Sequence, residues 1–184
     1  MAKIVLGIGT SHTPMLNTPV EDWPRFIERD RLRPHLTKDG RSVTYEELDR
    51  AMDRVAAALQ RDGTKQRQAV ASVAYPCVAQ ALVFLGALRA GSVAAPIQPS
   101  ATPAQIAGMI ADSGADIVFL DAANADALVG QDIAAKVVML EELDHWLAPA
   151  GATPDPVEIA PEDGFNIIYS SGTTGIPKIG RAHV

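Results

Sequence analysis

Residues 69–97 read AVASVAYPCVAQALVFLGALRAGSVAAPI, and this stretch decides the fold. An apolar run at 69–75 has the length and composition of a buried strand. Residues 76–90 are long enough for a buried helix, and Gly91 follows where a helix commonly ends. A second apolar run at 93–97 predicts another strand. A strand, a helix and a strand joined by short connections form a βαβ unit, in which the two strands lie parallel.

The same alternation continues on both sides of this unit. Thr102 and Gln105 form a capping box ahead of a helix that is expected to stop at Gly114, and Thr44 and Glu47 form the same box upstream. The other expected elements are a strand at 116–120, a helix at 123–128, a strand at 136–140, a helical turn at 141–147, a proline-rich linker at 148–161 and a strand from Phe165. We therefore expect an α/β fold of alternating β–α units forming a mostly parallel sheet.

Composition excludes several classes of protein. The chain has 184 residues, of which 47% are hydrophobic and 21% charged, as in an ordinary globular protein. A net charge of −6 argues against nucleic-acid and anionic-membrane partners, which favour a basic face. Cys77 is the only cysteine, so no disulfide framework is expected. No apolar run of about 18 residues predicts a membrane span, and no secretory signal is present, so we expect a cytoplasmic protein.

The candidate binding site is the loop within residues 165–178, FNIIYSSGTTGIPK. A short β-branched and aromatic run predicts a buried strand, and a cluster of glycines and hydroxyls follows it. Glycine amides, hydroxyls and one ammonium group are suited to hold phosphate oxygens, although such a cluster is also typical of a polar surface turn. The spacing differs from that of a Walker loop. The candidate phosphate-binding residues are Ser170, Ser171, Gly172, Thr173, Thr174, Gly175 and Lys178.

The string YSSGTTGIPK resembles the phosphate-binding loop of the adenylate-forming superfamily, which includes acyl-CoA synthetases, and residues 84–119 resemble the same enzymes. The resemblance implies that the loop contacts the phosphates of ATP. It also implies Mg²⁺ and CoA, and a reaction that joins a carboxylic acid to AMP, releases pyrophosphate and passes the acyl group to a thiol. The later parts of such an enzyme have no counterpart here, so we expect a ligase fragment, part of a large domain, that is inactive alone.

Residues 1–48 resemble the N-terminus of protocatechuate 4,5-type extradiol dioxygenases, through MAKIVLGIGTSHTPML, EDWPRFIERDR and KDGRSVTYEEL. That resemblance implies that His12 is a ligand of Fe²⁺. A single histidine does not complete an open-sided iron site, and neither His35 nor His145 lies in a stretch that resembles the other family motifs. The alternative interpretation is a loop histidine without a metal, which the sequence favours.

These resemblances predict three segments. Residues 1–43 form a dioxygenase-like segment, residues 44–178 form a partial AMP-binding domain, and residues 179–184, IGRAHV, form an artefactual tail. Ile179 occupies a position where the adenylate-forming pattern has glycine, and His183 in the tail is given no role. The expected chain is a chimera joined near residues 44–48. Neither the acid substrate nor the oligomeric state follows from the sequence.

Overall fold

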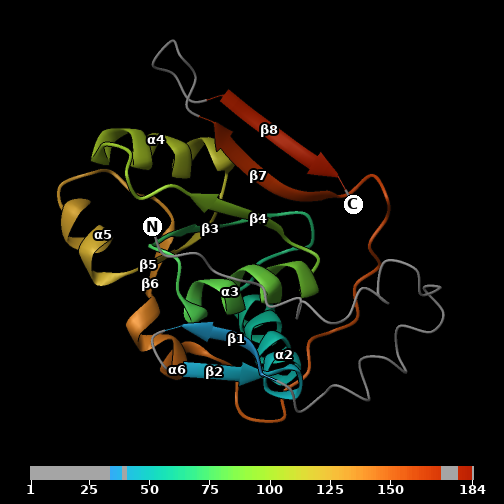
Figure 1. The fold of residues 1–184 in the computed structure, drawn as a ribbon. Helices are drawn as coiled ribbons and strands as arrows, with labels where there is room; N and C mark the ends of the chain where they lie inside the picture. Colours follow the sequence, from blue (N-terminus) through green and yellow to red (C-terminus); the bar gives the residue numbers. More distant parts are fainter. Residues whose placement is uncertain (1–33, 39–40, 171–177, 184) are drawn as a thin grey trace, which may run out of the picture.

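One six-stranded sheet forms the centre of the molecule (Figure 1). The computed structural model describes residues 34–38, 41–170 and 178–183. The strands lie in the order β6-β5-β3-β4-β7-β8, and all are parallel to their neighbours except β8, which is antiparallel to β7. Their bounds are β3 Ala69–Val73, β4 Val93–Ile97, β5 Ile117–Leu120, β6 Lys136–Met139, β7 Gly164–Ser170 and β8 Lys178–His183.

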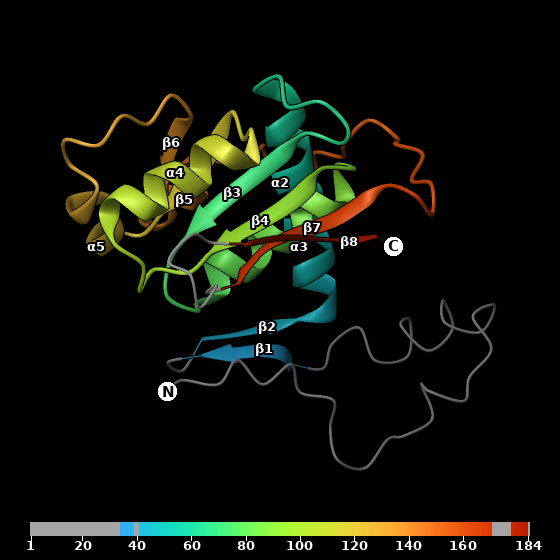
Figure 2. The same ribbon diagram turned by 90° about the horizontal axis from the view of Figure 1, so that it is seen from above.

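Helices cover both faces of the sheet, as Figures 1 and 2 show. On one face, α2, α3 and α6 bury residues such as Leu59, Val83 and Leu143 against β3, β5 and β6. On the other face, α4 buries Ile106 and Met109 against β3, β4 and β5. The helices are α2 Tyr45–Arg61, α3 Val78–Arg89, α4 Pro103–Ser113, α5 Ala122–Ala127 and α6 Leu143–Trp146, with the 3₁₀-helix η3 Leu140–Glu142 before α6. The predicted α/β fold is confirmed.

The two capping boxes placed the starts of α2 and α4 correctly. The Thr44 hydroxyl accepts a hydrogen bond from the Glu47 amide at the start of α2, and Thr102 does the same with Gln105 at the start of α4. The α4 helix ends at Gly114, whose φ of 68° is a left-handed conformation that glycine adopts without strain. The α3 helix begins later than predicted, because extended Cys77 is its N-cap and accepts from the Gln80 amide through Sγ.

Two strand pairs were not predicted from the sequence. Strands β1 (Pro34–Lys38) and β2 (Arg41–Thr44) form a separate antiparallel pair beside α2 and α3, where Val43 packs with Leu48 and Val78. Residues 178–183, most of which were expected to be a tail, form β8 against β7.

Residues 148–163 contain no helix or strand, as the prolines predicted, and this connection runs past α2 from α6 to β7 (Figure 1). None of the described helices is long and apolar enough to span a membrane.

Candidate functional site

The carboxyl ends of the parallel strands lie together along one side of the sheet, which we call the carboxyl-end edge. Val73 at the end of β3 pairs with Ile97 at the end of β4 and with Leu120 at the end of β5. The connections after β3 and β4 lead to helices on opposite faces of the sheet. In open α/β sheets, ligands bind outside the carboxyl ends of strands where successive connections diverge in this way. This edge is therefore the expected ligand-binding edge.

The candidate phosphate loop begins at this edge, at the end of β7. The antiparallel register pairs Ser170 of β7 with Lys178 of β8, so the two ends of the loop lie side by side. The five predicted site residues between these ends lie outside the described residues. They are Ser171, Gly172, Thr173, Thr174 and Gly175. The structure thus brings together the backbones of the first and last predicted site residues and leaves the contacts of the loop as a prediction.

The strand that leads into the loop is anchored on both faces of the sheet. The Tyr169 hydroxyl lies 3.0 Å from the Met109 carbonyl and 2.9 Å from Asp112 Oδ2, both in α4. On the other face, Phe165 packs edge-to-face on Phe84 of α3, with ring centroids 5.9 Å apart. Ile167 between them is buried in the core. The start of the loop is therefore held by packing on α3 and α4.

Asp121 organises the same edge and was not singled out from the sequence. Its Oδ2 accepts a hydrogen bond from the Tyr75 amide at 3.0 Å, which ties the end of β3 to the end of β5. Its Oδ1 accepts from the Asn124 amide at 2.9 Å and so caps α5. An aspartate between a buried strand and a helix is an N-cap signal, and this signal was available in the sequence. Tyr75, 59% exposed, projects at this edge.

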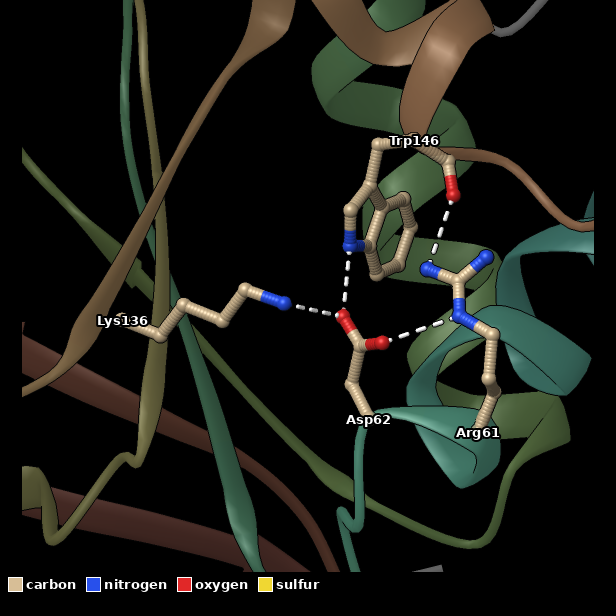
Figure 3. Close-up of polar contacts among 4 residues, drawn as sticks. All are labelled: Arg61, Asp62, Lys136 and Trp146. Atoms are coloured by element: carbon tan, nitrogen blue, oxygen red, sulfur yellow. Dashed lines mark hydrogen bonds and ion pairs between the residues drawn. The ribbon is translucent and has the colours of Figure 1, made fainter.

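A charge cluster lies at the opposite ends of the strands, around the partly buried Asp62 (Figure 3). Asp62 Oδ2 accepts hydrogen bonds from Lys136 Nζ at 2.6 Å and from Trp146 Nε1 at 2.8 Å. Asp62 Oδ1 accepts from Arg61 Nε at 2.9 Å, and Arg61 Nη2 also donates to the Trp146 carbonyl at 3.0 Å. Burial raises the pKa of Asp62, but these hydrogen bonds outweigh it and hold the pKa at about 2. The cluster joins the end of α2 to β6 and α6.

Other polar residues of the chain have structural or surface positions. Arg89 donates to Asp53 at 2.8 Å and to Asp49 at 2.7 Å, so it links α3 to α2 and does not face the ligand edge. Gln98 is exposed directly after β4, and His145 is exposed on α6. His12 lies outside the described residues. Within the described part of the chain, no group of three or more His, Cys, Asp and Glu residues is arranged to hold a metal ion.

The family follows from a match that covers most of the chain. Residues 23–179 match the model of the AMP-binding enzyme family, from upstream of β1 to the first residues of β8. The chain belongs to the AMP-binding enzyme family. The match includes the whole predicted phosphate loop and begins within the segment assigned above to a dioxygenase-like start. The predicted boundary near residue 44 stays a prediction.

Curated relatives and solved structures agree with this family. The chain is 28% identical over 171 residues to a fatty acid–[acyl-carrier-protein] ligase, ScoC, from Streptomyces coeruleorubidus, covering 91% of this chain and 33% of ScoC. It is 28% identical over 177 residues to 4-coumarate-CoA ligase 1 from Narcissus pseudonarcissus, covering 91% and 32%. The N-terminal subdomain of Klebsiella oxytoca NpsA has the same fold, with a TM-score of 0.72, 20% identity and 89% and 40% of the two chains covered. The chain thus spans about a third of the length of these two ligases.

Proposed function

We propose that this chain supplies the ATP phosphate-binding loop of an AMP-forming carboxylic acid–thiol ligase. One observation carries the proposal. The antiparallel register that pairs Ser170 with Lys178 brings the two ends of YSSGTTGIPK together near the carboxyl ends of the parallel strands. Hydroxyls, glycine amides and an ammonium group are donors, which suits the phosphates of ATP. Mg²⁺ in such sites is held by phosphate oxygens together with one or two carboxylates.

The names of the relatives point to two classes of thiol acceptor. One relative is named as a ligase for an acyl-carrier protein and the other as a CoA ligase. We propose CoA as the acceptor, a carrier-protein thiol as the alternative, and a small carboxylic acid as the substrate. The cytoplasm is the proposed location, because ATP and CoA chemistry belongs there. Because the chain spans about a third of these relatives, we propose that it binds nucleotide without completing the reaction.

Titration of the purified chain with Mg-ATP by isothermal calorimetry tests the loop. Lys178→Ala removes the ammonium group, and we expect ATP affinity to fall by about tenfold or more, since a charge-assisted hydrogen bond contributes about 1.5–3 kcal/mol. Lys65→Ala is the matched control, because Lys65 is exposed and lies beyond the amino ends of the strands. Equal ATP affinity of the two variants, or no binding by the unaltered chain, would contradict the proposed loop.

A pyrophosphate-exchange assay tests the second part of the proposal. We expect no acid-dependent exchange of pyrophosphate into ATP by this chain alone. Detectable exchange would show that the parts found only in the longer relatives are unnecessary for adenylation.

The dioxygenase-like start and the chimera near residue 44 remain separate proposals. Oxygen uptake with protocatechuate or gallate plus Fe²⁺, lost on His12→Ala, would support an iron-dependent activity for residues 1–48. A non-enzymatic or misfolding fragment is the remaining alternative, and a cooperative thermal transition in solution would count against misfolding.

A further inference from the structure

Tyr75 differs from the aromatic residues of the core. Phe84 packs edge-to-face on Phe165, and Phe119 packs edge-to-face on Trp146, so these four rings are partnered within the fold. Tyr75 is 59% exposed and lies at the carboxyl-end edge, two positions after the last residue of β3. A single exposed apolar residue is ordinary on a protein surface, so the surroundings of Tyr75 decide whether it has a role.

The backbone on both sides of the exposed Tyr75 side chain is fixed. The Tyr75 amide donates to Asp121 Oδ2 at 3.0 Å, and Asp121 is itself held as the N-cap of α5. The preceding carbonyl, that of Ala74, accepts from Gln80 Nε2 of α3 at 3.4 Å. Pro76 follows and restricts the backbone further. An exposed ring on a backbone held by neighbouring elements is preorganised for contact with a ligand.

Tyr75 also lies close to the candidate phosphate loop. It follows β3, at the point where the connections after β3 and β4 diverge to opposite faces of the sheet. The parallel register places Val70 of β3, Ala94 of β4 and Asn166 of β7 level with one another. Tyr75 is five positions beyond this level and Ser170 is four. Only β4 separates β3 from β7, so the two strands are about 10 Å apart.

The reactants of the proposed function supply one kind of flat ring. ATP and CoA each carry an adenine, and the faces of nucleobases stack on aromatic side chains. An ATP molecule held by its phosphates in the loop is long enough to cross the end of β4 to Tyr75. CoA must bring its thiol to the same carboxyl-end edge to accept the acyl group.

We propose that Tyr75 is a specificity-determining residue whose ring stacks on the adenine of ATP or of CoA at the carboxyl-end edge. Asp121 is then a positioning residue, because it holds the Tyr75 backbone. The inference rests on the proposed function, which supplies the two adenine-containing reactants. It deepens that function by giving the nucleoside part of a reactant a contact separate from the phosphate loop.

Isothermal calorimetry with four ligands tests the proposal. Mg-ATP is compared with Mg-tripolyphosphate, and CoA with 4′-phosphopantetheine, because the second member of each pair lacks adenosine. We expect Tyr75→Ala to weaken binding of ATP or CoA by about fivefold or more, the ratio that stacking of one base on an aromatic side chain provides. The two ligands without adenine should bind to the variant as they bind to the unaltered chain. The reactant whose affinity falls is the one that carries the stacked ring.

Two control variants separate stacking from a general effect on the fold. Tyr75→Phe keeps the ring and should bind all four ligands as the unaltered chain does. Ile159→Ala removes an apolar side chain that is 49% exposed at the opposite ends of the strands, and it should change none of the affinities. The melting temperature of Tyr75→Ala should not fall, because the exposed side chain makes few contacts.

The outcomes distinguish the Tyr75 contact from the phosphate loop. Unchanged affinity of Tyr75→Ala for both ATP and CoA, or no binding of either by the unaltered chain, would overturn the stacking assignment. An equal loss of affinity for the ligands with and without adenine would overturn it as well. A tripolyphosphate affinity that Lys178→Ala leaves unchanged would instead contradict the loop, whatever Tyr75→Ala shows.

Discussion

Gly86 lies where α3 packs against α2, and Val55 occupies the space beside it. A Cβ atom added at position 86 would lie 2.4 Å from both Cβ and Cγ1 of Val55, which is fully buried. Alanine normally favours a helix over glycine by about 1 kcal/mol, but here the added methyl group forces the two helices apart. We expect Gly86→Ala to lower the free energy of unfolding by about 1–3 kcal/mol, measured by urea titration.

Gly108 on α4 is the matched control for this prediction. It is exposed, and an added Cβ would meet no atom within 4 Å. Gly108→Ala should therefore show the intrinsic helix preference alone and raise the free energy of unfolding by about 0.5–1 kcal/mol. Changes of the same sign in the two variants would show that the contact with Val55 does not determine the result.

Asp62 gives the molecule a defined response to acid. Its folded-state pKa of about 2 lies below the ordinary value of 3.8, so the ionised carboxylate stabilises the folded chain above about pH 4. This contribution is lost as the pH falls from about 4 to about 2. It is at most about 2 kcal/mol, and solvent screening reduces it because Arg61 and Lys136 are 48% and 55% exposed.

Urea titrations of Asp62→Asn from pH 6 to pH 2 test this response. We expect the variant to be less stable than the unaltered chain at pH 6 and the difference to shrink towards pH 2. Asp144→Asn, at an exposed position on α6, should show no such change in the difference. A stability difference that is constant across this range would contradict the proposed role of the Asp62 carboxylate.

Among the elements, the connection at residues 148–163 depends on side chains of α2. Gln60 Nε2 donates to the Asp155 carbonyl at 3.0 Å, and the Asp155 amide donates to Gln60 Oε1 at 2.7 Å. One side chain thus pairs with both backbone groups of Asp155, as a neighbouring strand would. Arg54 also donates to the Ala148 carbonyl at 2.7 Å. The connection is held in part by polar contacts near the surface, which open more readily than a buried core.

Hydrogen exchange detected by mass spectrometry tests this attachment. Gln60→Ala should speed exchange in the peptide that contains Asp155 and change the global free energy of unfolding by no more than about 1 kcal/mol. Gln131→Ala, at an exposed position after α5, should leave exchange at Asp155 unchanged. Equal exchange in all three proteins would show that Gln60 does not hold the connection.

The elements also show how far sequence reasoning extends. The α2 and α4 starts were predicted because a capping box is formed by residues three apart, and both boxes are present. Strand β8 could not be predicted, because KIGRAH is not a strongly apolar run and pairs only because β7 lies beside it. The Asp62 cluster escaped prediction for the same reason, since its partners Lys136 and Trp146 are more than 70 positions away in the sequence.

For the whole molecule, the net charge and the edge strand β6 together predict that copies of the chain associate near pH 5. The isoelectric point is about 5.1, where charge repulsion between copies disappears. Within the described residues, β6 pairs only with β5, and Val137 on this edge strand is 45% exposed. Exposed apolar residues on an edge strand promote pairing between molecules, and an unpaired charge beside them opposes it, whereas Lys136 of β6 is already ion-paired with Asp62.

Light scattering between pH 4 and pH 8 tests this prediction with a matched pair of variants. We expect Val137→Lys to reduce scattering near pH 5 more than Val129→Lys does. Both variants add one positive charge, so they change the net charge equally. They differ in position, because Val129, 79% exposed, follows α5 and does not lie on an edge strand. Equal scattering from both variants would indicate that charge alone controls association.

The sequence by itself determined the βαβ alternation, the capping boxes of α2 and α4 and the family, because these depend on residues that are neighbours in the chain or on a contiguous motif. Only the tertiary structure decided the strand order, the pairing of Ser170 with Lys178, the Asp62 cluster and the hydrogen bond between Tyr75 and Asp121. The physical reason is that each of these requires residues distant in sequence to meet. Such contacts are selected by the packing of the whole sheet and its helices, and no local pattern encodes them.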